Sequence, residues 1–154
     1  MHATRETAPA TRPPGRETYL TFLVGDQSYC LPFLRVAEVR TLRNCTPVLE
    51  GPSYGEGIFP LHTQIVPLLD LRVRFGQPAR FTPETRLIVA WVSRAGQRDR
   101  PFGLLVDRIE NIVPIEPGSV DRTACLNFST QERFLRGIAR LNGTPTALLD
   151  LEEL

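Results

Sequence analysis

The chain has 154 residues, of which 42% are hydrophobic and 23% are charged, and its formal net charge is +1. That length can bury a core without a disulfide or metal, and the composition excludes a disordered, fibrous or membrane-spanning protein. Nucleic acids and anionic membranes select a concentrated positive surface, so the near-zero charge gives no reason to expect either as a partner.

Three cysteines, Cys30, Cys45 and Cys125, are far apart and lack a CxxC spacing or a nearby histidine cluster. This pattern favours free thiols in a reducing compartment, with no metal site and no cofactor. No segment reaches the roughly 18 apolar residues of a membrane span, and the N-terminus lacks the apolar centre of a secretory signal. We therefore expect a cytoplasmic protein without direct membrane insertion.

Residues 1–16 are rich in Pro, Thr and Arg and contain almost no large apolar side chain. Such a segment cannot bury enough surface to offset its chain entropy, so we expect a disordered N-terminal arm. A transit peptide also has an Arg-rich, acid-poor start, but residues 1–16 show no amphipathic helical pattern and contain Pro-Pro.

Order is predicted from residue 17. Apolar residues alternate on both sides of the Gly25-Asp26 turn, which indicates a β-hairpin over 17–33. In 35–42 the apolar and polar residues alternate, which predicts a strand with two different faces. Further short apolar segments predict strands at 57–61, 64–69, 86–92, 102–115, 136–141 and 145–151. No long segment keeps a helical period, so the fold class is predicted to be all-β, or mainly β.

An internal repeat organises these strands. GIFPLHTQIVPLLDL at 57–71 recurs as GIARLNGTPTALLDL at 137–151, and ETYL at 17–20 recurs as ETRL at 84–87. Each repeat carries a hairpin, a Val-rich strand, a loop and then the Leu-Leu-Asp-Leu segment. We infer two similar small β-barrels related by a pseudo-twofold axis, because closing a short meander into a barrel removes its exposed edges.

The repeat sets the expected domain organisation. One domain should span 17–154, with a first barrel unit at about 17–76 and a second at about 84–154. Exchange of chain segments between the two units is left open.

Each repeat ends in an aspartate that fits the N-cap of a short helical turn. Asp70 precedes LRVRF, which Gly76 should end, and Asp150 precedes LEEL, where Glu153 has the spacing of a capping box. Paired aspartates in a duplicated β unit could also form a protease-like dyad. That chemistry places Thr or Ser and then Gly after each Asp, whereas Leu follows both here, so we interpret them as caps.

Candidate catalytic groups are scarce. His62 is the only histidine beyond residue 16, and an enzyme would have to combine it with a group such as Asp70 or Cys30, without the local signature of a nucleophile. His62 could instead lie at a hairpin surface or contact a partner. Trp91 lies in an apolar run and is predicted to be a core residue. RNA binding by a basic aromatic groove is a weaker alternative, because aromatic residues make up only 8% of the chain.

Four segments, taken in order, carry a resemblance to a known family. They are FLVGDQSYCLPFLRVAEV, GPSYGEGIFPLHTQIVPLLDLRVRFG, FGLLVDRIENIV and FLRGIARLNGTPTALLDLEEL. Together they resemble the CheW family of chemotaxis coupling proteins over residues 17–154. The resemblance implies two five-stranded SH3-like β-barrels with short helical turns around a shared hydrophobic interior. It also implies a non-enzymatic adaptor between the cytoplasmic tip of a chemoreceptor and a CheA-type histidine kinase, whose regulatory domain has the same fold.

The resemblance also implies partner-binding residues. The Val-x-Glu strand and the Gly-containing hairpin provide the expected receptor-facing groove residues, which are Val36, Glu38, Gly57, Phe59 and His62. Apolar residues of the first hairpin are expected to contribute to the kinase contact, with a position in the core as an equally open alternative; these are Tyr29, Leu31 and Phe33.

The hairpin of residues 57–63 departs from the family pattern. The family usually has Gly-Val-x-Asn-Leu-Arg-Gly, whereas this chain has GIFPLHT. Proline removes a backbone donor, histidine replaces a permanently charged side chain, and threonine tolerates a positive φ poorly. We therefore expect strand pairing and tip conformation to differ locally. The departure favours service in a divergent pathway, such as pilus-based motility, or a repurposed double-barrel interaction module for another signalling partner.

Overall fold

The computed structural model describes residues 17–42, 48–50, 56–78, 80–93, 98–122 and 134–153, so the predicted arm at 1–16 lies outside the described residues. The short helical segments that lie wholly within these ranges are η1 (Phe33–Arg35), α2 (Leu71–Arg74), η2 (Pro117–Ser119) and η5 (Leu151–Glu153). The strands are β1 (Glu17–Val24), β2 (Gln27–Pro32), β3 (Val36–Thr41), β4 (Val48–Glu50), β5 (Glu56–Leu61), β6 (Gln64–Asp70), β7 (Arg86–Val92), β8 (Arg100–Val106), β9 (Arg108–Ile115), β10 (Val120–Asp121), β11 (Leu135–Leu141) and β12 (Thr144–Leu149).

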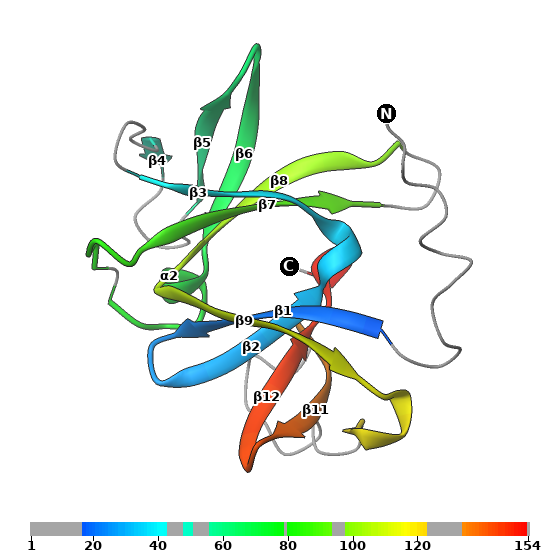
Figure 1. The fold of residues 1–154 in the computed structure, drawn as a ribbon. Helices are drawn as coiled ribbons and strands as arrows, with labels where there is room; N and C mark the ends of the chain where they lie inside the picture. The colour runs from blue at the N-terminus through cyan, green and yellow to red at the C-terminus, as the bar shows by residue number, and fades with distance from the viewer. Residues whose placement is uncertain are drawn as a thin grey trace.

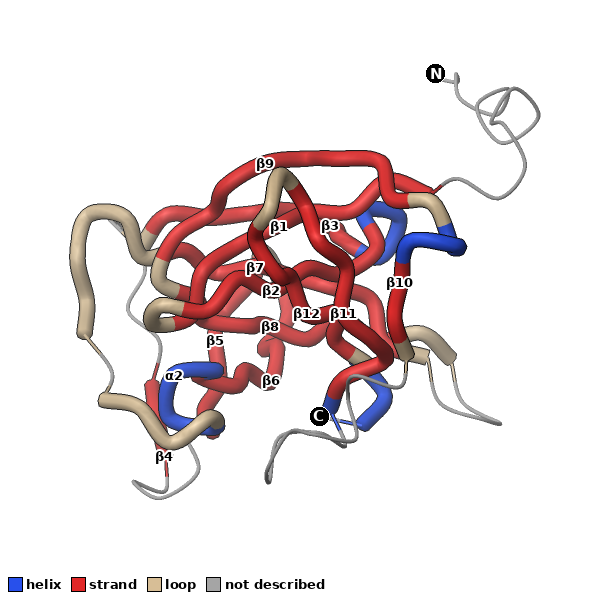
Figure 2. The backbone as a smooth tube through the Cα atoms, turned by 90° about the horizontal axis from the view of Figure 1, so that it is seen from below, coloured by secondary structure: helices blue, strands red, loops and turns tan. Residues whose placement is uncertain are grey.

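The strands form two sheets, as shown in Figure 1. Sheet A has the order β10-β11-β12-β2-β1-β9, and sheet B has the order β3-β7-β8-β6-β5-β4. Each sheet has five longer strands and one very short edge strand, β10 or β4. Helical segments are single turns at strand ends (Figure 2). The predicted all-β class is confirmed. None of the helices within the described ranges is long and apolar enough to cross a membrane.

The two sheets have the same strand order when the repeats are matched. The hairpin β1–β2 pairs with β9 and, in parallel, with β12, and the hairpin β7–β8 pairs with β3 and, in parallel, with β6. Each repeat therefore gives its first hairpin to the sheet that holds the rest of the other repeat. The boundaries of the repeats in the sequence do not coincide with the boundaries of the sheets.

In the part of the chain that the structure describes, buried apolar side chains lie in three clusters. The largest lies between the sheets and draws Leu20 and Phe22 from sheet A and Ile88 and Leu104 from sheet B. Smaller clusters belong to one sheet each, one around Phe59 in sheet B and one with Cys30 in sheet A. Two curled sheets around their own clusters, with a third cluster shared between them, match the double-barrel expectation. Trp91 was predicted in the core, but this residue, near the end of β7, is 39% exposed.

The predicted helix caps are present at the ends of both repeats. Asp70 accepts a hydrogen bond of 3.0 Å from the Arg72 amide, and Asp150 accepts one of 3.2 Å from the Glu152 amide. Gly76, with φ +80°, ends the first turn. The predicted capping box at Glu153 is wrong, because the Asp150 amide donates to the Phe134 carbonyl at 2.7 Å instead.

A buried ion-pair network, which we name the first clamp, joins the two sheets. The Arg72 guanidinium donates to both carboxylate oxygens of Asp70, at 2.5 and 3.1 Å, and to Asp107 at 2.9 Å. Asp107 lies between β8 and β9, and its other oxygen accepts from the Gly25 amide in the β1–β2 turn at 2.6 Å. Burial by itself would lower the pKa of Arg72, but the hydrogen bonds to Asp70 and Asp107 raise it, so the guanidinium stays charged.

A second clamp occupies the equivalent place in the other repeat with its charges reversed. Glu152 in the turn after β12 pairs at 2.7 Å with Arg35, which lies just before β3. The same carboxylate accepts from the Ser93 amide, just after β7, at 3.3 Å. Burial would raise the pKa of Glu152, but the hydrogen bonds from Arg35 and Ser93 hold it below its usual value. Each clamp therefore fixes one of the two crossings between the sheets.

Candidate partner-binding site

The hairpin β5–β6 ends in a two-residue turn formed by His62 and Thr63. The flanking pair Leu61 and Gln64 matches the pair Leu141 and Thr144 in the second repeat, so strand pairing at the tip is the same in both hairpins. The expected difference in pairing from the usual family hairpin stays a prediction. The tip conformation does differ, because the second repeat has positive φ at both turn residues, whereas the first has it only at His62, at 55°.

Glu38 is the centre of a small polar cluster at this tip. Its Oε2 lies 3.4 Å from His62 Nε2, and its Oε1 lies 3.7 Å from Arg40 Nη1. The Arg40 guanidinium also lies over the Phe59 ring, 5.6 Å from its centroid. Strands β3 and β5 are not neighbours in sheet B, so the curl of the sheet brings these residues together. We name Glu38, Arg40 and His62 the tip cluster.

The tip cluster is open to solvent and weakly bound to itself. The exposed fractions of the His62 and Glu38 side chains are 71% and 35%, and the His62 contact is an ion pair only when the imidazole is protonated. Pairs at such exposure contribute at most about 1 kcal/mol each. Their charges therefore remain accessible to a partner, and the cluster adds little to the stability of the fold.

The structure brings together only part of the expected receptor-facing set. Glu38 and His62 are in contact, and Phe59 lies below them, fully buried in the cluster of sheet B. Phe59 therefore supports the tip through Arg40 and does not offer its own surface. Val36 is half-buried against the main core at the start of β3, and Gly57 lies at the end of β5 away from the tip.

Two of the three residues expected at a kinase contact are core residues. Tyr29 stacks on Phe75 with ring centroids 5.0 Å apart, and Leu31 is fully buried. Strand β2 lies inside sheet A between β12 and β1, with the main core on one face and the sheet A cluster on the other, so it has no solvent face along 28–31. Phe33 is outside this region, in η1, and its side chain is 40% exposed.

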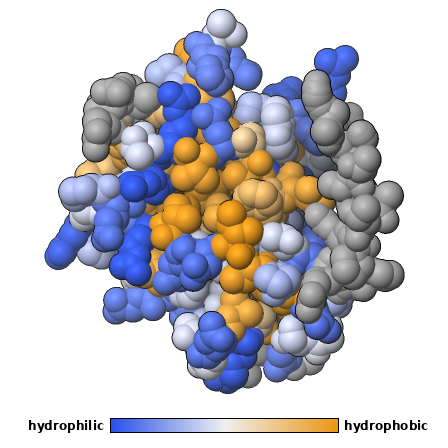
Figure 3. Space-filling view, in the orientation of Figure 1, coloured by the Kyte–Doolittle hydropathy of each residue, from blue (hydrophilic) through white to orange (hydrophobic). Residues whose placement is uncertain are grey.

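An exposed apolar surface continues from Phe33 and was missed by the sequence analysis. Leu34 is 66% exposed, and the Arg35 guanidinium donates at 2.8 Å to the carbonyl of Trp91. Figure 3 shows apolar side chains across the middle of the face on which β3 and β9 run, with hydrophilic side chains on the left and at the top and bottom of the view. A three-residue helical turn has no periodicity to reveal its exposed side, so no pattern in the sequence marked this surface.

The enzyme alternative finds no support in the geometry. Asp70 and Cys30, the suggested partners of His62, are completely buried, and Asp70 binds Arg72. Burial raises the pKa of the Cys30 thiol to about 12, which keeps it protonated and unreactive at neutral pH. Within the described residues no cluster of three or more His, Cys, Asp or Glu side chains could hold a metal ion.

Comparison with known proteins identifies the family. Residues 18–154 match the family model of the CheW-like domain. The chain is 30% identical over 141 residues to the probable chemotaxis protein CheW of Rhizobium etli, covering 91% of this chain and 88% of that protein. It is also 30% identical over 142 residues to the chemotaxis protein CheW of Rhizobium meliloti, with 91% and 87% covered.

A solved structure agrees with the sequence comparison. The crystal structure of the scaffolding protein TtCheW from Thermoanaerobacter tengcongensis matches with a TM-score of 0.72 and 27% identity, over 87% of this chain and 88% of that one. Sheet order, internal repeat, family model and relatives agree, and the chain therefore belongs to the CheW family of chemotaxis scaffold proteins.

Proposed function

We propose that this chain is a non-catalytic cytoplasmic adaptor that couples the cytoplasmic tip of a chemoreceptor to the regulatory domain of a CheA-type histidine kinase. An adaptor acts by holding two partners close together, so it needs surfaces and no reactive groups. Membership of the CheW family supports this role. The observation that carries it is the exposed tip cluster above the buried side chain of Phe59.

We assign the receptor contact to Glu38 and His62, with Arg40 added, and keep Val36 and Gly57 as flanking positions. The apolar surface at η1 lies on the crossing between β2 and β3, where a second protein of the same fold could pack barrel against barrel. We assign the kinase contact to this surface, with Phe33 and Leu34 as its exposed apolar residues.

A second candidate function is a repurposed double-barrel module that binds another signalling protein and assembles no receptor–kinase array. The sequence at the β5–β6 hairpin tip favours this second function, because His62 and Thr63 occupy positions where the family pattern has Arg and Gly. The two candidates differ in what they bind.

Co-sedimentation with the cognate receptor in membranes and with the cognate kinase separates these functions. The adaptor should pellet only with receptor membranes and should carry the kinase regulatory domain with it. No binding of the kinase domain at tens of micromolar (a Kd weaker than about 10⁻⁴ M) would refute the kinase half. Binding of the kinase without assembly on the receptor would favour the second candidate.

A further inference from the structure

A groove lies beside the hairpin tip, between two strands that separate. Strands β6 and β8 are parallel and pair at Leu68–Asp70 with Gly103–Leu105. Toward their N-terminal ends they diverge, β6 following the β5–β6 hairpin and β8 following β7 (Figure 1). The space has a volume of about 660 Å³ and is lined by Gln64, Ile65, Pro67, Arg98, Asp99, Arg100 and Pro101. It lies within the size range of ligand sites, about 300 to 1,000 Å³.

Three residues of the lining, two from β6 and one from β8, are apolar. Ile65 is 65% exposed, Pro67 is exposed, and Pro101 is half-buried. Such a large exposed fraction is unusual for an isoleucine inside a strand. Pro67 and Pro101 carry no amide donor, so the lining near them offers apolar contact and few hydrogen bonds. This wall would accept an aliphatic side chain.

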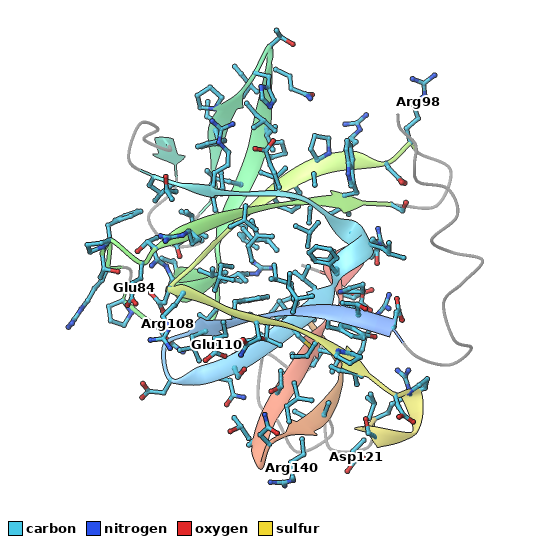
Figure 4. The ribbon with its side chains drawn as sticks, viewed as in Figure 1. Glu84, Arg98, Arg108, Glu110, Asp121 and Arg140 are labelled. Carbon is cyan, nitrogen blue, oxygen red and sulfur yellow. The ribbon has the colours of Figure 1, made fainter. Side chains whose placement is uncertain are left out.

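The part of the lining before and at the start of β8 is basic. Arg98 extends away from the sheets just before β8, as Figure 4 shows, and Arg100 is the first residue of β8. Within the described ranges neither guanidinium has an acidic partner, whereas Arg35, Arg72, Arg108 and Arg136 are all paired with carboxylates. The one carboxylate of the lining, Asp99, accepts a hydrogen bond from the Ser93 hydroxyl. Two guanidiniums are therefore left to bind carboxylates.

We propose that this groove binds an extended acidic segment of a partner protein, with an aliphatic side chain against Ile65, Pro67 and Pro101 and flanking carboxylates at Arg98 and Arg100. Side chains alternate along an extended chain, so its apolar residues can contact Ile65, Pro67 and Pro101 while its acidic residues reach the two arginines. A nucleic acid fits less well, because the lining has no aromatic ring for base stacking and contains Asp99. The inference goes beyond the proposed function and does not rest on it.

The test uses the full chain and a fluorescein-labelled peptide of alternating Glu and Val, followed by fluorescence anisotropy at low salt. We expect this peptide to bind about tenfold more tightly than matched Glu/Ser and Lys/Val peptides. The double variant Arg98→Gln/Arg100→Gln and the single variant Ile65→Ser should each weaken binding by about tenfold. Raised salt should also weaken binding of the Glu/Val peptide to the unaltered chain, because exposed charges are screened.

Arg140→Gln is the matched control, since Arg140 is an exposed arginine on β11 at the opposite end of the molecule (Figure 4). It should change affinity by less than about twofold. Three results would overturn the inference: no binding of the Glu/Val peptide up to about 1 mM, equal binding of the Glu/Ser peptide, or an equal effect of Arg140→Gln. Tighter binding of a labelled oligo(dT) than of the Glu/Val peptide would identify a nucleic-acid site and also overturn it. None of these assays needs the receptor or kinase, so their outcome is separate from that of the proposed function.

Discussion

At the tip of the β5–β6 hairpin, a single residue adopts the left-handed backbone conformation that two residues share at the tip of the second hairpin. Thr63 avoids the positive φ that Gly143 adopts at the matching position, and His62 alone turns with φ 55°. Histidine tolerates this conformation better than a β-branched residue does, although a left-handed backbone still costs about 1 to 2 kcal/mol. The sequence alone indicated that the tip would differ but could not say which residue would take the unusual conformation.

Replacing His62 with arginine should separate the two partner contacts. His62→Arg places a permanent cation beside Glu38, so affinity for receptor membranes should change by about tenfold, while affinity for the kinase domain stays within about twofold. Calorimetry for the kinase and co-sedimentation for the receptor give the two values. The matched control is Asn142→Arg, because Asn142 lies at the tip of the second hairpin and its φ of 50° is close to that of His62. Equal effects of His62→Arg on both partners would contradict the proposed division.

Single residues were predicted well where one local contact decides their role. Asp70 and Asp150 were identified as caps because the cap depends on a neighbouring amide two residues away. Tyr29 and Trp91 were harder to place, because their burial depends on which strands lie next to β2 and β7. A short strand pattern shows that a residue is apolar but does not show whether both faces of its sheet are covered.

Among the elements, the two clamps show how the short turns after β6 and β12 hold the sheets together. Arg72 is almost completely buried, whereas the side chains of Arg35 and Glu152 are 28% and 25% exposed. No sequence pattern revealed either clamp, since each joins positions from three separate segments. The repeat predicted that the turns would be equivalent, but the reversal of charge became visible only when Arg35 and Asp107 were found at equivalent crossings.

The two clamps should contribute unequally to stability. Arg72→Met leaves Asp70 as an unpaired buried carboxylate and should lower the free energy of unfolding by about 3 to 5 kcal/mol. Arg35→Met, the control at the second clamp, should cost only about 1 kcal/mol, because water reaches Glu152 and takes over part of its hydrogen bonding. Urea unfolding followed by circular dichroism measures both. Comparable losses would mean that burial does not distinguish the clamps.

The second clamp also has a pH signature. The pKa of Glu152 is lower in the folded chain than its usual value of 4.5. The stabilisation is therefore fully present above the pKa of the unfolded chain and disappears as the pH falls through the folded pKa. The loss of unfolding free energy caused by Arg35→Met should be constant near neutral pH and should shrink below about pH 4.5. If the loss of unfolding free energy in Arg35→Met grows as the pH falls, the ion pair with Glu152 is not the means by which Arg35 stabilises the fold.

At the scale of the whole molecule, the exchange of hairpins makes each repeat dependent on the other. The sequence repeat correctly indicated two similar units, but it could not show which hairpin joins which sheet, because the matched hairpins have nearly equal patterns. The arrangement is decided by the parallel contacts β12–β2 and β6–β8, which join segments far apart in the chain. Sheet B uses a continuous stretch, 36–106, whereas sheet A needs both 17–32 and 108–149.

Fragments of the chain should therefore fold according to sheets and not according to repeats. A fragment of residues 17–78 holds one complete repeat, yet its hairpin β1–β2 lacks β9 and β12, and its remaining strands lack β7 and β8. We expect it to show little β signal by circular dichroism and no cooperative unfolding in urea.

The fragment 36–106 keeps every strand of sheet B and the cluster around Phe59, but exposes its half of the main core. It should retain β signal and bind the dye ANS, as loosely packed compact states do. Mixing 17–78 with 80–154 should restore cooperative unfolding, because only the two repeats together supply both parallel contacts. Cooperative unfolding of 17–78 by itself as a monomer would show that the repeat folds without the exchange.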